Sequence, residues 1–320
     1  MTDPGSAVTS AAIEASEMQA DSQGSGAPES WSALGASAKP SGLTRDALRR
    51  LRQNPGAVAG LIVLLAIIAI SIFAGQLAPY DPIQQDTQAI REAPSRQHLM
   101  GTDNFGRDIF SRVLYGGRRS LPVGFVAIGI ASVIGVTFGL IAGYLGGFTD
   151  TLVMRGSDIL LAFPGILLAL ALVAILGTSL FNLMLAVGIA TIPEYTRVVR
   201  SAVLTTRETE YVTAARVSGA GDGTIMFRHI LPNVLPPIIV LVTLGIAGAI
   251  ILGATLSFLG LGVKPPVPEW GNMLSDGRTM MRHQWWVAFF PGLAIMLTVL
   301  AINLFGDGLR DAIDPRMRNR

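Results

Sequence analysis

The chain has 320 residues, of which 50% are hydrophobic and only 14% are charged. An ordinary globular domain carries about 25% charged residues, whereas long stretches of this chain carry none. The composition excludes an ordinary soluble protein and indicates that lipid surrounds most of the chain. The formal net charge of +2 is too balanced to indicate a nucleic-acid surface, so we expect no nucleic acid among the partners.

Cysteine is absent, and the three histidines lie far apart in the sequence. Disulfides, thiolate metal sites and a cysteine nucleophile are therefore excluded, and no local metal motif is present. The sequence also lacks a phosphate-binding loop and the short motifs of serine hydrolases and zinc proteases. We expect no catalytic residue, metal or cofactor in this chain.

The N-terminal residues 1–42 are rich in Ser, Ala, Gly and acidic residues, and Lys39 is their only basic residue. They lack the basic and apolar regions of a signal peptide. Their apolar surface is too small to offset the entropy cost of ordering. We expect a disordered cytoplasmic tail over 1–42 and a membrane domain over 43–320.

Long uncharged stretches predict an all-α membrane protein with six transmembrane helices, because a spanning helix needs about 20 apolar residues. A turn at Gly177–Ser179 divides the longest stretch into two. The expected spans are 56–79, 120–145, 158–176, 180–200, 236–261 and 287–306. The segments on the same side of the membrane as the N-terminus hold 15 Lys and Arg residues, and the segments on the opposite side hold 9. Because basic residues are more frequent on the cytoplasmic side, both termini are expected in the cytoplasm.

Charged residues inside a bilayer are costly and usually mark ion or proton pathways. Glu194 and Asp307 are expected near span ends, so the bilayer interior carries almost no charge. This pattern disfavours a channel or an ion-coupled carrier. A membrane enzyme is also disfavoured, because the sequence lacks the acid–base or metal constellation that catalysis would need. If the chain moves a solute, the energy is expected to come from another polypeptide.

The second expected span carries glycines at a four-residue spacing, Gly135, Gly139 and Gly143. Such a face lets a neighbouring helix approach closely. Two interpretations stay open: packing within this subunit, and contact with a partner subunit or a moving helix.

The segment 205–233 is the most informative polar segment. Thr205 and Glu208 have the spacing of a capping box, which predicts a helix that ends at Gly219. A second short helix is expected to end at Pro232. The first helix carries a run of small residues, which suits insertion into a groove of another protein. The alternative is an ordinary amphipathic connector.

Residues 81–119 are expected to form a folded cap on the extracytoplasmic side, with a short interfacial helix leading into the second span. Six residues have turn and helix-start chemistry there, namely Gly101, Thr102, Asp103, Gly106, Arg107 and Asp108. In the later segment 263–286, three tryptophans are expected at the membrane interface, Trp270, Trp285 and Trp286.

Four motifs, in this order, resemble those of ABC-importer permeases. They are the stretch from His98 to Leu121, the pattern Glu-x3-Ala-Ala-x3-Gly with His-Ile-Leu-Pro-Asn after it, Trp270–Leu274, and Asn303–Arg316. The first stretch is similar to that of the second permease subunit of dipeptide, oligopeptide and nickel importers. The resemblance covers about residues 43–320, and the long tail departs from the shortest members of the family.

The resemblance implies the transmembrane domain of a type I ABC importer in the plasma membrane, which imports di- or oligopeptides. A nickel or other small-solute importer is the alternative. The implied partners are a homologous permease, two cytoplasmic ABC ATPases that bind ATP and Mg, an extracytoplasmic binding protein, and membrane lipid. The resemblance also implies that segment 205–233 docks on an ATPase. The residues matched there are Glu210, Ala214, Ala215, Gly219, His229 and Pro232.

Overall fold

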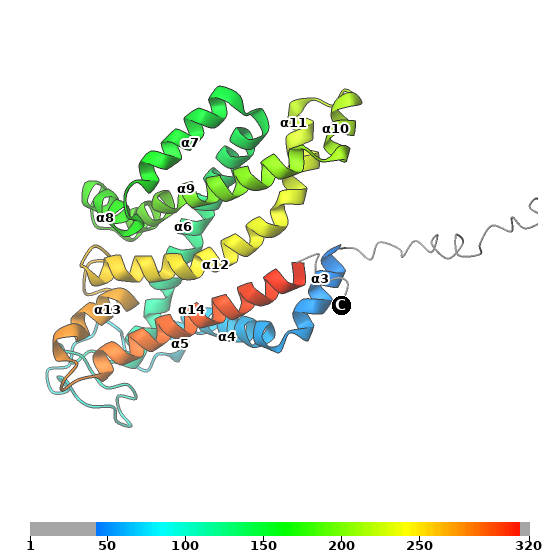
Figure 1. Cartoon of the computed structure of the whole chain (residues 1–320). Coiled ribbons are helices and arrows are strands. Elements are labelled where there is room, and N and C mark those ends of the chain that lie inside the picture. The colour runs from blue at the N-terminus through cyan, green and yellow to red at the C-terminus, as the bar shows by residue number, and fades with distance from the viewer. Residues whose placement is uncertain (1–42, 314–320) are drawn as a thin grey trace, which may run out of the picture. The chain divides into compact units, whose positions relative to one another are not determined.

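The structure, a computed structural model, describes residues 43–313 (Figure 1). Its contacts divide the chain into two units between Asp46 and Ala47, and the fold below is that of the second unit. The expected disordered tail 1–42 lies outside the described residues, as does the end of the fourth motif, 314–320. In the described part every regular element is a helix, and the only strand-like feature is an isolated bridge between Thr102 and Asp108.

The helices range from single turns to rods of membrane length. In chain order they are α3 (Leu43–Gln53), α4 (Pro55–Ile72), α5 (Ala74–Leu77), α6 (Ile109–Leu145), α7 (Gly147–Leu161), α8 (Gly165–Leu176), α9 (Leu180–Arg207), α10 (Glu210–Val217), α11 (Asp222–Thr224), the π-helical turn Ile225–Ile230, α12 (Leu231–Phe258), α13 (Trp270–Gly277), the 3-10 turn Arg278–Met280 and α14 (Trp286–Ile313).

Local sequence signals set many of the helix ends. The side chains of Asn54, Asp108 and Ser179 each accept a hydrogen bond from a backbone N–H in the first turn of α4, α6 and α9. Gly146 and Gly177, both with positive φ, follow the last residues of α6 and α8. The turn expected at Gly177–Ser179 is therefore present.

Four helical segments are long and apolar enough to cross a membrane: α4, α6, the continuous run Asp222–Phe258 that ends with α12, and α14. The pair α7 and α8 would supply a fifth crossing, although its two helices are bent by 89°. The expected count of six spans is thus met in part, with four or five apolar candidates among the described residues.

The expected single helix over 158–176 is broken between Leu161 and Gly165. Pro164 is the cause, because proline lacks an N–H donor and disfavours helical geometry in the residue before it. The second piece, α8, has 12 residues and is about 18 Å long, too short to cross a hydrocarbon core of about 30 Å alone.

The expected interfacial helix before the second span is also absent as a separate element. α6 runs without interruption over 37 residues from Ile109 to Leu145, with Pro122 inside it. The first span was expected to reach residue 79, whereas its helix α4 ends at Ile72 and is followed by the four-residue α5.

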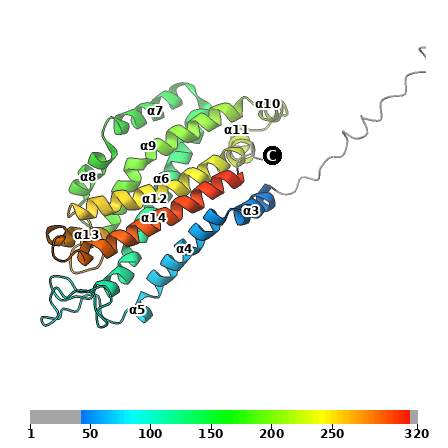
Figure 2. The same cartoon turned by 60° about the horizontal axis from the view of Figure 1, so that its bottom comes forward.

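Successive long helices run in opposite directions through the bundle (Figures 1 and 2). Gly308 near the end of α14 lies against Ala57 at the start of α4. At the other end, the indole nitrogen of Trp286 at the start of α14 donates to the Thr102 carbonyl of the cap at 3.1 Å. The start of α4 and the end of α14 therefore lie on the same side of the bundle.

Candidate functional site

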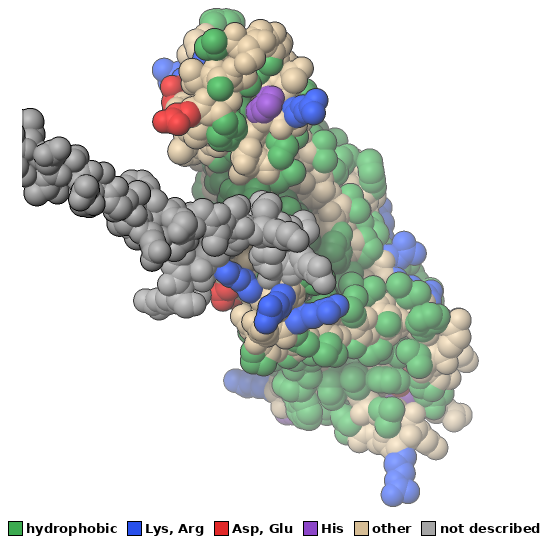
Figure 3. Space-filling model, turned by 90° about the vertical axis from the view of Figure 1, so that its right-hand side faces the viewer, with side chains coloured by type: hydrophobic (Ala, Val, Ile, Leu, Met, Phe, Trp, Pro, Cys, Tyr) green, Lys and Arg blue, Asp and Glu red, His purple; other side chains and the backbone are tan. Residues whose placement is uncertain are grey.

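The segment between α9 and α12 forms a small lobe at one end of the bundle (Figure 1). Val212 of α10 and Ile225 and Ile230 of the π-helical turn are fully buried. They share one hydrophobic cluster with Val203 of α9. Figure 3 looks at this end of the molecule and shows charged and histidine side chains on the lobe, with hydrophobic side chains along the helices below it.

The helix α10 ends where the glycine pattern predicts. Gly219 has φ +80°, and its N–H donates to the Arg216 carbonyl at 3.0 Å. The next N–H, of Ala220, donates to the Ala215 carbonyl at 3.1 Å. These two bonds form a Schellman cap, which requires a left-handed residue at this position.

The small residues of α10 are accessible. Glu210 and Ala214 are exposed and Ala215 is half-buried. A Cβ atom on Gly219 would have no heavy atom within 4 Å in the described chain. The small residues therefore lie on the outer surface of the helix, beside the exposed Tyr211 and Val217, while Val212 holds its inner side.

Two expectations for this segment were wrong. Thr205 and Glu208 do not form a capping box, because α9 continues to Arg207 and Thr209 is the residue that precedes α10. Pro232 does not end a helix, because the π-helical turn leads directly into α12 and Pro232 lies in the first turn of α12. The wider turn accommodates the proline ring, which clashes with a carbonyl four residues earlier in a regular α-helix.

Side chains outside the expected motif hold the lobe on the end of α6. The Tyr144 hydroxyl donates to Asp222 Oδ1 at 2.6 Å, and Arg207 Nη1 donates to the Gly143 carbonyl at 2.8 Å. The partners lie 78 and 64 residues apart in sequence, so no local pattern could identify them. His229 is half-buried beside this lobe, and its backbone carbonyl accepts from Asn233.

The glycine repeat of α6 packs against α9 of the same chain. A Cβ on Gly135 would lie 2.5 Å from Tyr195 Cβ, and a Cβ on Gly143 would lie 2.8 Å from Val203 Cβ. At Gly139 the nearest atom would be the Thr196 carbonyl oxygen at 2.7 Å. Of the two open interpretations, the structure supports packing within this subunit. The close pair of α6 and α9 also joins the lobe to the centre of the bundle.

Glu194 lies in the middle of α9, as the 15th of its 28 residues, and is exposed. The helix continues to Arg207, beyond residue 200 where the span is expected to end. α9 continues through charged residues because two acids of α7 pair with them. Arg197 Nη2 lies 2.6 Å from Asp158 Oδ1, and Arg200 makes a bidentate pair with Asp150.

The opposite end of the bundle carries the expected cap. Asp108 begins α6, and its Oδ2 accepts from the Ser111 N–H and hydroxyl at 2.7 Å each. Asp108 Oδ1 lies 3.0 Å from His98 Nδ1. Gly101 and Gly106 have φ +73° and +72°, and a Cβ on Gly106 would overlap the Asp86 carbonyl. The turn and helix-start residues thus serve the local structure that their pattern predicts.

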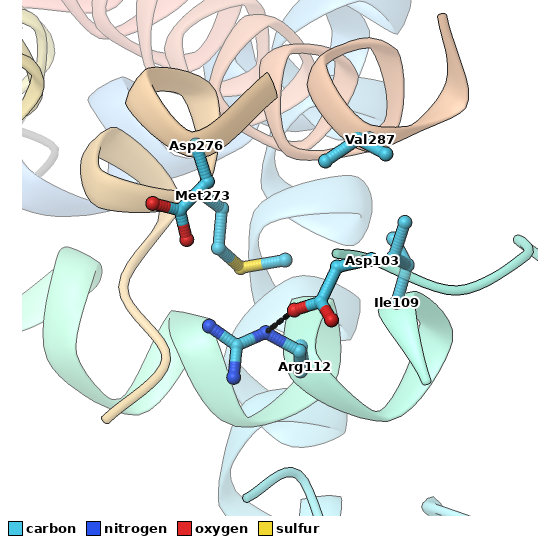
Figure 4. Close-up of a pocket in the computed structure, with 6 residues that line it drawn as sticks. All are labelled: Asp103, Ile109, Arg112, Met273, Asp276 and Val287. Carbon is cyan, nitrogen blue, oxygen red and sulfur yellow. Dashed lines mark ion pairs between the residues drawn. The ribbon is translucent and has the colours of Figure 1, made fainter. Parts of the chain in front are cut away.

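A buried ion-pair cluster ties the cap to α13 (Figure 4). Asp103 Oδ2 lies 2.6 Å from Arg107 Nε and 3.6 Å from Arg112 Nε. Arg107 Nη2 lies 3.7 Å from Asp276 Oδ2 on α13. Burial raises the pKa of the Asp276 carboxyl, although the nearby Arg107 and Arg112 oppose that shift. The small pocket at this cluster is lined mostly by these paired groups and by apolar side chains, so it leaves little free polar chemistry.

Two of the three tryptophans expected at the membrane interface are buried inside the protein. Trp270 is only 2% exposed and Trp286 is also buried, whereas Trp285 is exposed. The Trp270 indole donates to the Val113 carbonyl at 2.9 Å, which satisfies its one polar group inside the protein. Beside it, Glu269 accepts from the Gly271 and Asn272 N–H groups. Burial raises the pKa of Glu269 in spite of these donors.

Among residues 43–313, no three His, Asp or Glu side chains lie together as metal ligands would. The arrangement instead consists of a bundle of apolar helices, a tightly closed cap at one end and an exposed helical lobe at the other. These features define a multi-pass membrane protein with an exposed helical lobe at one end of its bundle.

Comparison with known proteins identifies the family. Residues 135–319 match the family described as binding-protein-dependent transport system inner membrane component. Residues 42–94 match the N-terminal TM domain of oligopeptide transport permease C. The chain belongs to this family of ABC-importer permeases.

Relatives and a solved structure agree with this assignment. The chain is 50% identical to the dipeptide transport system permease protein of Alkalihalophilus pseudofirmus over 275 residues, 86% of this chain and 90% of that protein. It is 50% identical to the glutathione transport system permease protein of Pectobacterium atrosepticum over 85% of this chain and 90% of that protein. The inward-facing MetNI methionine ABC transporter has the same fold, with a TM-score of 0.54 at 19% identity over 63% of this chain and 96% of that one.

Proposed function

We propose that this chain is a membrane subunit of an ATP-driven importer of short peptides. The relatives named for dipeptide and glutathione transport both carry small peptides in their names, and the match covers 90% of each. The observation that carries the mechanical role is α10, a helix with exposed small residues at Ala214 and Gly219 after its end, held on the ends of α6 and α9. A force applied at α10 would reach the bundle through these contacts.

The proposed assembly has five parts besides lipid. A homologous permease shares the translocation path, two cytoplasmic ABC ATPases bind ATP and Mg, and an extracytoplasmic binding protein delivers the peptide. This chain carries no catalytic step and no cofactor of its own. It converts closure of the ATPases into inward-facing and outward-facing states of the path.

We propose six membrane spans, with both termini in the cytoplasm. The opposite directions of successive helices support this topology, with α9 and the bent pair α7–α8 each counted as one crossing. Reporter fusions at Gln88 and Asp222 should report opposite sides of the membrane. Reports from the same side would contradict the topology.

The coupling role is tested by Ala214→Arg. Position 214 is exposed and helical, and Arg is nearly as favourable as Ala in a helix, so the subunit itself should fold normally. Arg at Gly219 would be a poorer test, because its φ of +80° adds backbone strain to any partner effect. In the assembled transporter, Ala214→Arg should overpack the ATPase groove and leave a charge desolvated there.

The expected result is loss of peptide uptake and weaker co-purification of the ATPases. Ala214→Ser is the matched control, because it keeps a small side chain and should retain both. Normal uptake and full ATPase association for Ala214→Arg would show that segment 205–233 is only a connector. Uptake of nickel or another small solute in place of peptides by the unaltered transporter would favour the alternative substrate.

The cap is proposed to meet the binding protein through its exposed residues. Asp103 and Glu269 are 3% and 2% exposed, so neither can contact another protein. Leu99 and Phe105 are exposed on the cap and are better sites for a photocrosslinker. Capture of the binding protein during turnover would support docking, and its absence at both sites would leave the cap with a stabilising role.

A further inference from the structure

One face of α9 carries polar side chains that stay exposed in the described part of the chain. Its members are Glu194, Arg197, Ser201 and Thr205, all exposed. Their spacings of three, four and four residues place them on one side of the helix. We call this set the α9 stripe. It begins in the middle of α9 and runs to the end that carries the α10 lobe.

In the other half of α9, the same face is buried. Leu183 and Val187 are fully buried there, in one cluster with Ala169 and Val173 of α8. The stripe therefore starts where the cover by α8 ends. It opens only toward the end that the proposed topology places at the cytoplasm.

The stripe carries an uncompensated negative charge. Arg197 is paired with Asp158 of α7 at 2.6 Å, and both side chains remain about half exposed. Among residues 43–313, no ion pair or hydrogen bond involves the Glu194 carboxylate. A carboxylate at mid-helix is costly in contact with lipid and is found where a helix faces water or a partner charge. Three charged groups on neighbouring surfaces of α7 and α9 make a polar wall, which is unsuited to lipid.

We propose that the α9 stripe lines the cytoplasmic half of the translocation path, and that Glu194 binds the α-ammonium group of the transported peptide. This proposal rests on the proposed function and assigns a site within it. A short peptide at neutral pH carries one ammonium group whatever its side chains. A single carboxylate that accepts a charge-assisted hydrogen bond from it would serve many sequences. The exposed guanidinium of Arg197 and the hydroxyls of Ser201 and Thr205 provide polar groups along the route to the cytoplasm.

Water access is measured with single cysteines, because the chain has none of its own. In the complete transporter in inside-out vesicles, Val198→Cys places a thiol one helical turn from Glu194. Ile62→Cys on α4 is the matched control, since Ile62 is exposed on an apolar helix. Labelling of this subunit is followed with a membrane-impermeant cationic methanethiosulfonate and with its anionic counterpart.

Val198→Cys should react faster than Ile62→Cys and should prefer the cationic reagent by about tenfold. Adding Glu194→Gln should remove that preference while the thiol stays reactive. Equal reactivity of the two cysteines would overturn the proposal, because the stripe would then face lipid or pack against the partner permease. A cation preference that persists in Glu194→Gln would overturn the role of Glu194.

Transport supplies an independent readout. ATP-driven dipeptide uptake by Glu194→Gln should fall about tenfold or more in kcat/KM, the loss expected for one hydrogen bond between charged groups. Asp311→Asn, which alters an exposed carboxylate on α14, is the control and should retain uptake. If the unaltered transporter imports no peptide, the proposed function fails. If it does and Glu194→Gln matches Asp311→Asn, only this further proposal fails.

Discussion

The close contact of α6 and α9 predicts that Gly139→Ala destabilises the subunit. The new Cβ would lie 2.7 Å from the Thr196 carbonyl oxygen, 2.7 Å from Val199 Cβ and 3.0 Å from the Arg200 backbone nitrogen. Two of these three atoms belong to the backbone of α9, so the contact cannot be relieved by a change of rotamer. The helices must move apart. Overpacking of this kind costs about 1–3 kcal/mol.

The same substitution also has a stabilising effect on the helix, which must be separated from the cost of overpacking. Alanine is favoured over glycine in a helix interior by about 1 kcal/mol. Gly129→Ala supplies that effect alone, because Gly129 also lies inside α6 and its Cβ would have no atom within 4 Å. The difference between the two variants therefore measures the contact with α9. We expect Gly139→Ala to be less stable than Gly129→Ala by about 1–3 kcal/mol.

The measurement is unfolding of the purified subunit in lipid–detergent micelles by increasing SDS, followed by helical circular dichroism. The subunit is used without its partner permease, so that no outside contact at position 129 contributes. Gly139→Ala should unfold at lower SDS than Gly129→Ala. Equal midpoints would mean that α6 and α9 are not in the contact described here, and the mechanical link between the α10 lobe and the bundle would lose its basis.

Three further outcomes are expected. Asp108→Ala should lose the N-cap of α6 and remove the acceptor of the Ser111 O–H, lowering the free energy of unfolding of the subunit by about 1–2 kcal/mol. Because burial raises the pKa of Glu269 above its ordinary value of 4.5, its folded state holds the proton more tightly than the unfolded state. Stability should therefore fall as pH rises from that value through the folded-state pKa, and Glu269→Gln should flatten this part of the profile. Tyr144→Phe should free Asp222 and make the α10 lobe more sensitive to limited proteolysis, with the bundle unchanged.

Features that depend on neighbouring residues could be predicted from the sequence. Asp108 begins α6 because a carboxylate caps the first N–H groups of a helix, and Gly219 ends α10 because the Schellman cap needs a positive φ. The break in the third expected span had a local signal too. Pro164 lies within the uncharged stretch, and its rigid ring breaks the helix although the residues around it are apolar.

Features that depend on distant residues could not be predicted in this way. The N–H of the buried Trp270 donates to a carbonyl 157 residues away in sequence, and nothing in segment 263–286 itself indicates that contact. α9 continues past the expected end of its span because Asp150 and Asp158 neutralise Arg200 and Arg197. Along the sequence of α9, the charged residues mark the end of the apolar stretch. In the structure, ion pairs with α7 neutralise these residues, so the helix continues through them.

This continuation of α9 connects the proposed site with the coupling lobe. At the end that carries the α10 lobe, Val203 packs with the α10 cluster and Arg207 holds the end of α6. In its middle it presents Glu194, about 19 Å from Arg207 along the helix axis. The glycine contacts pack α9 closely against α6 between these points. In the proposed assembly, a displacement of α10 by an ATPase would be transmitted along this helix pair to the Glu194 carboxylate, which gives the proposal a physical route from ATP binding to release of the peptide ammonium group.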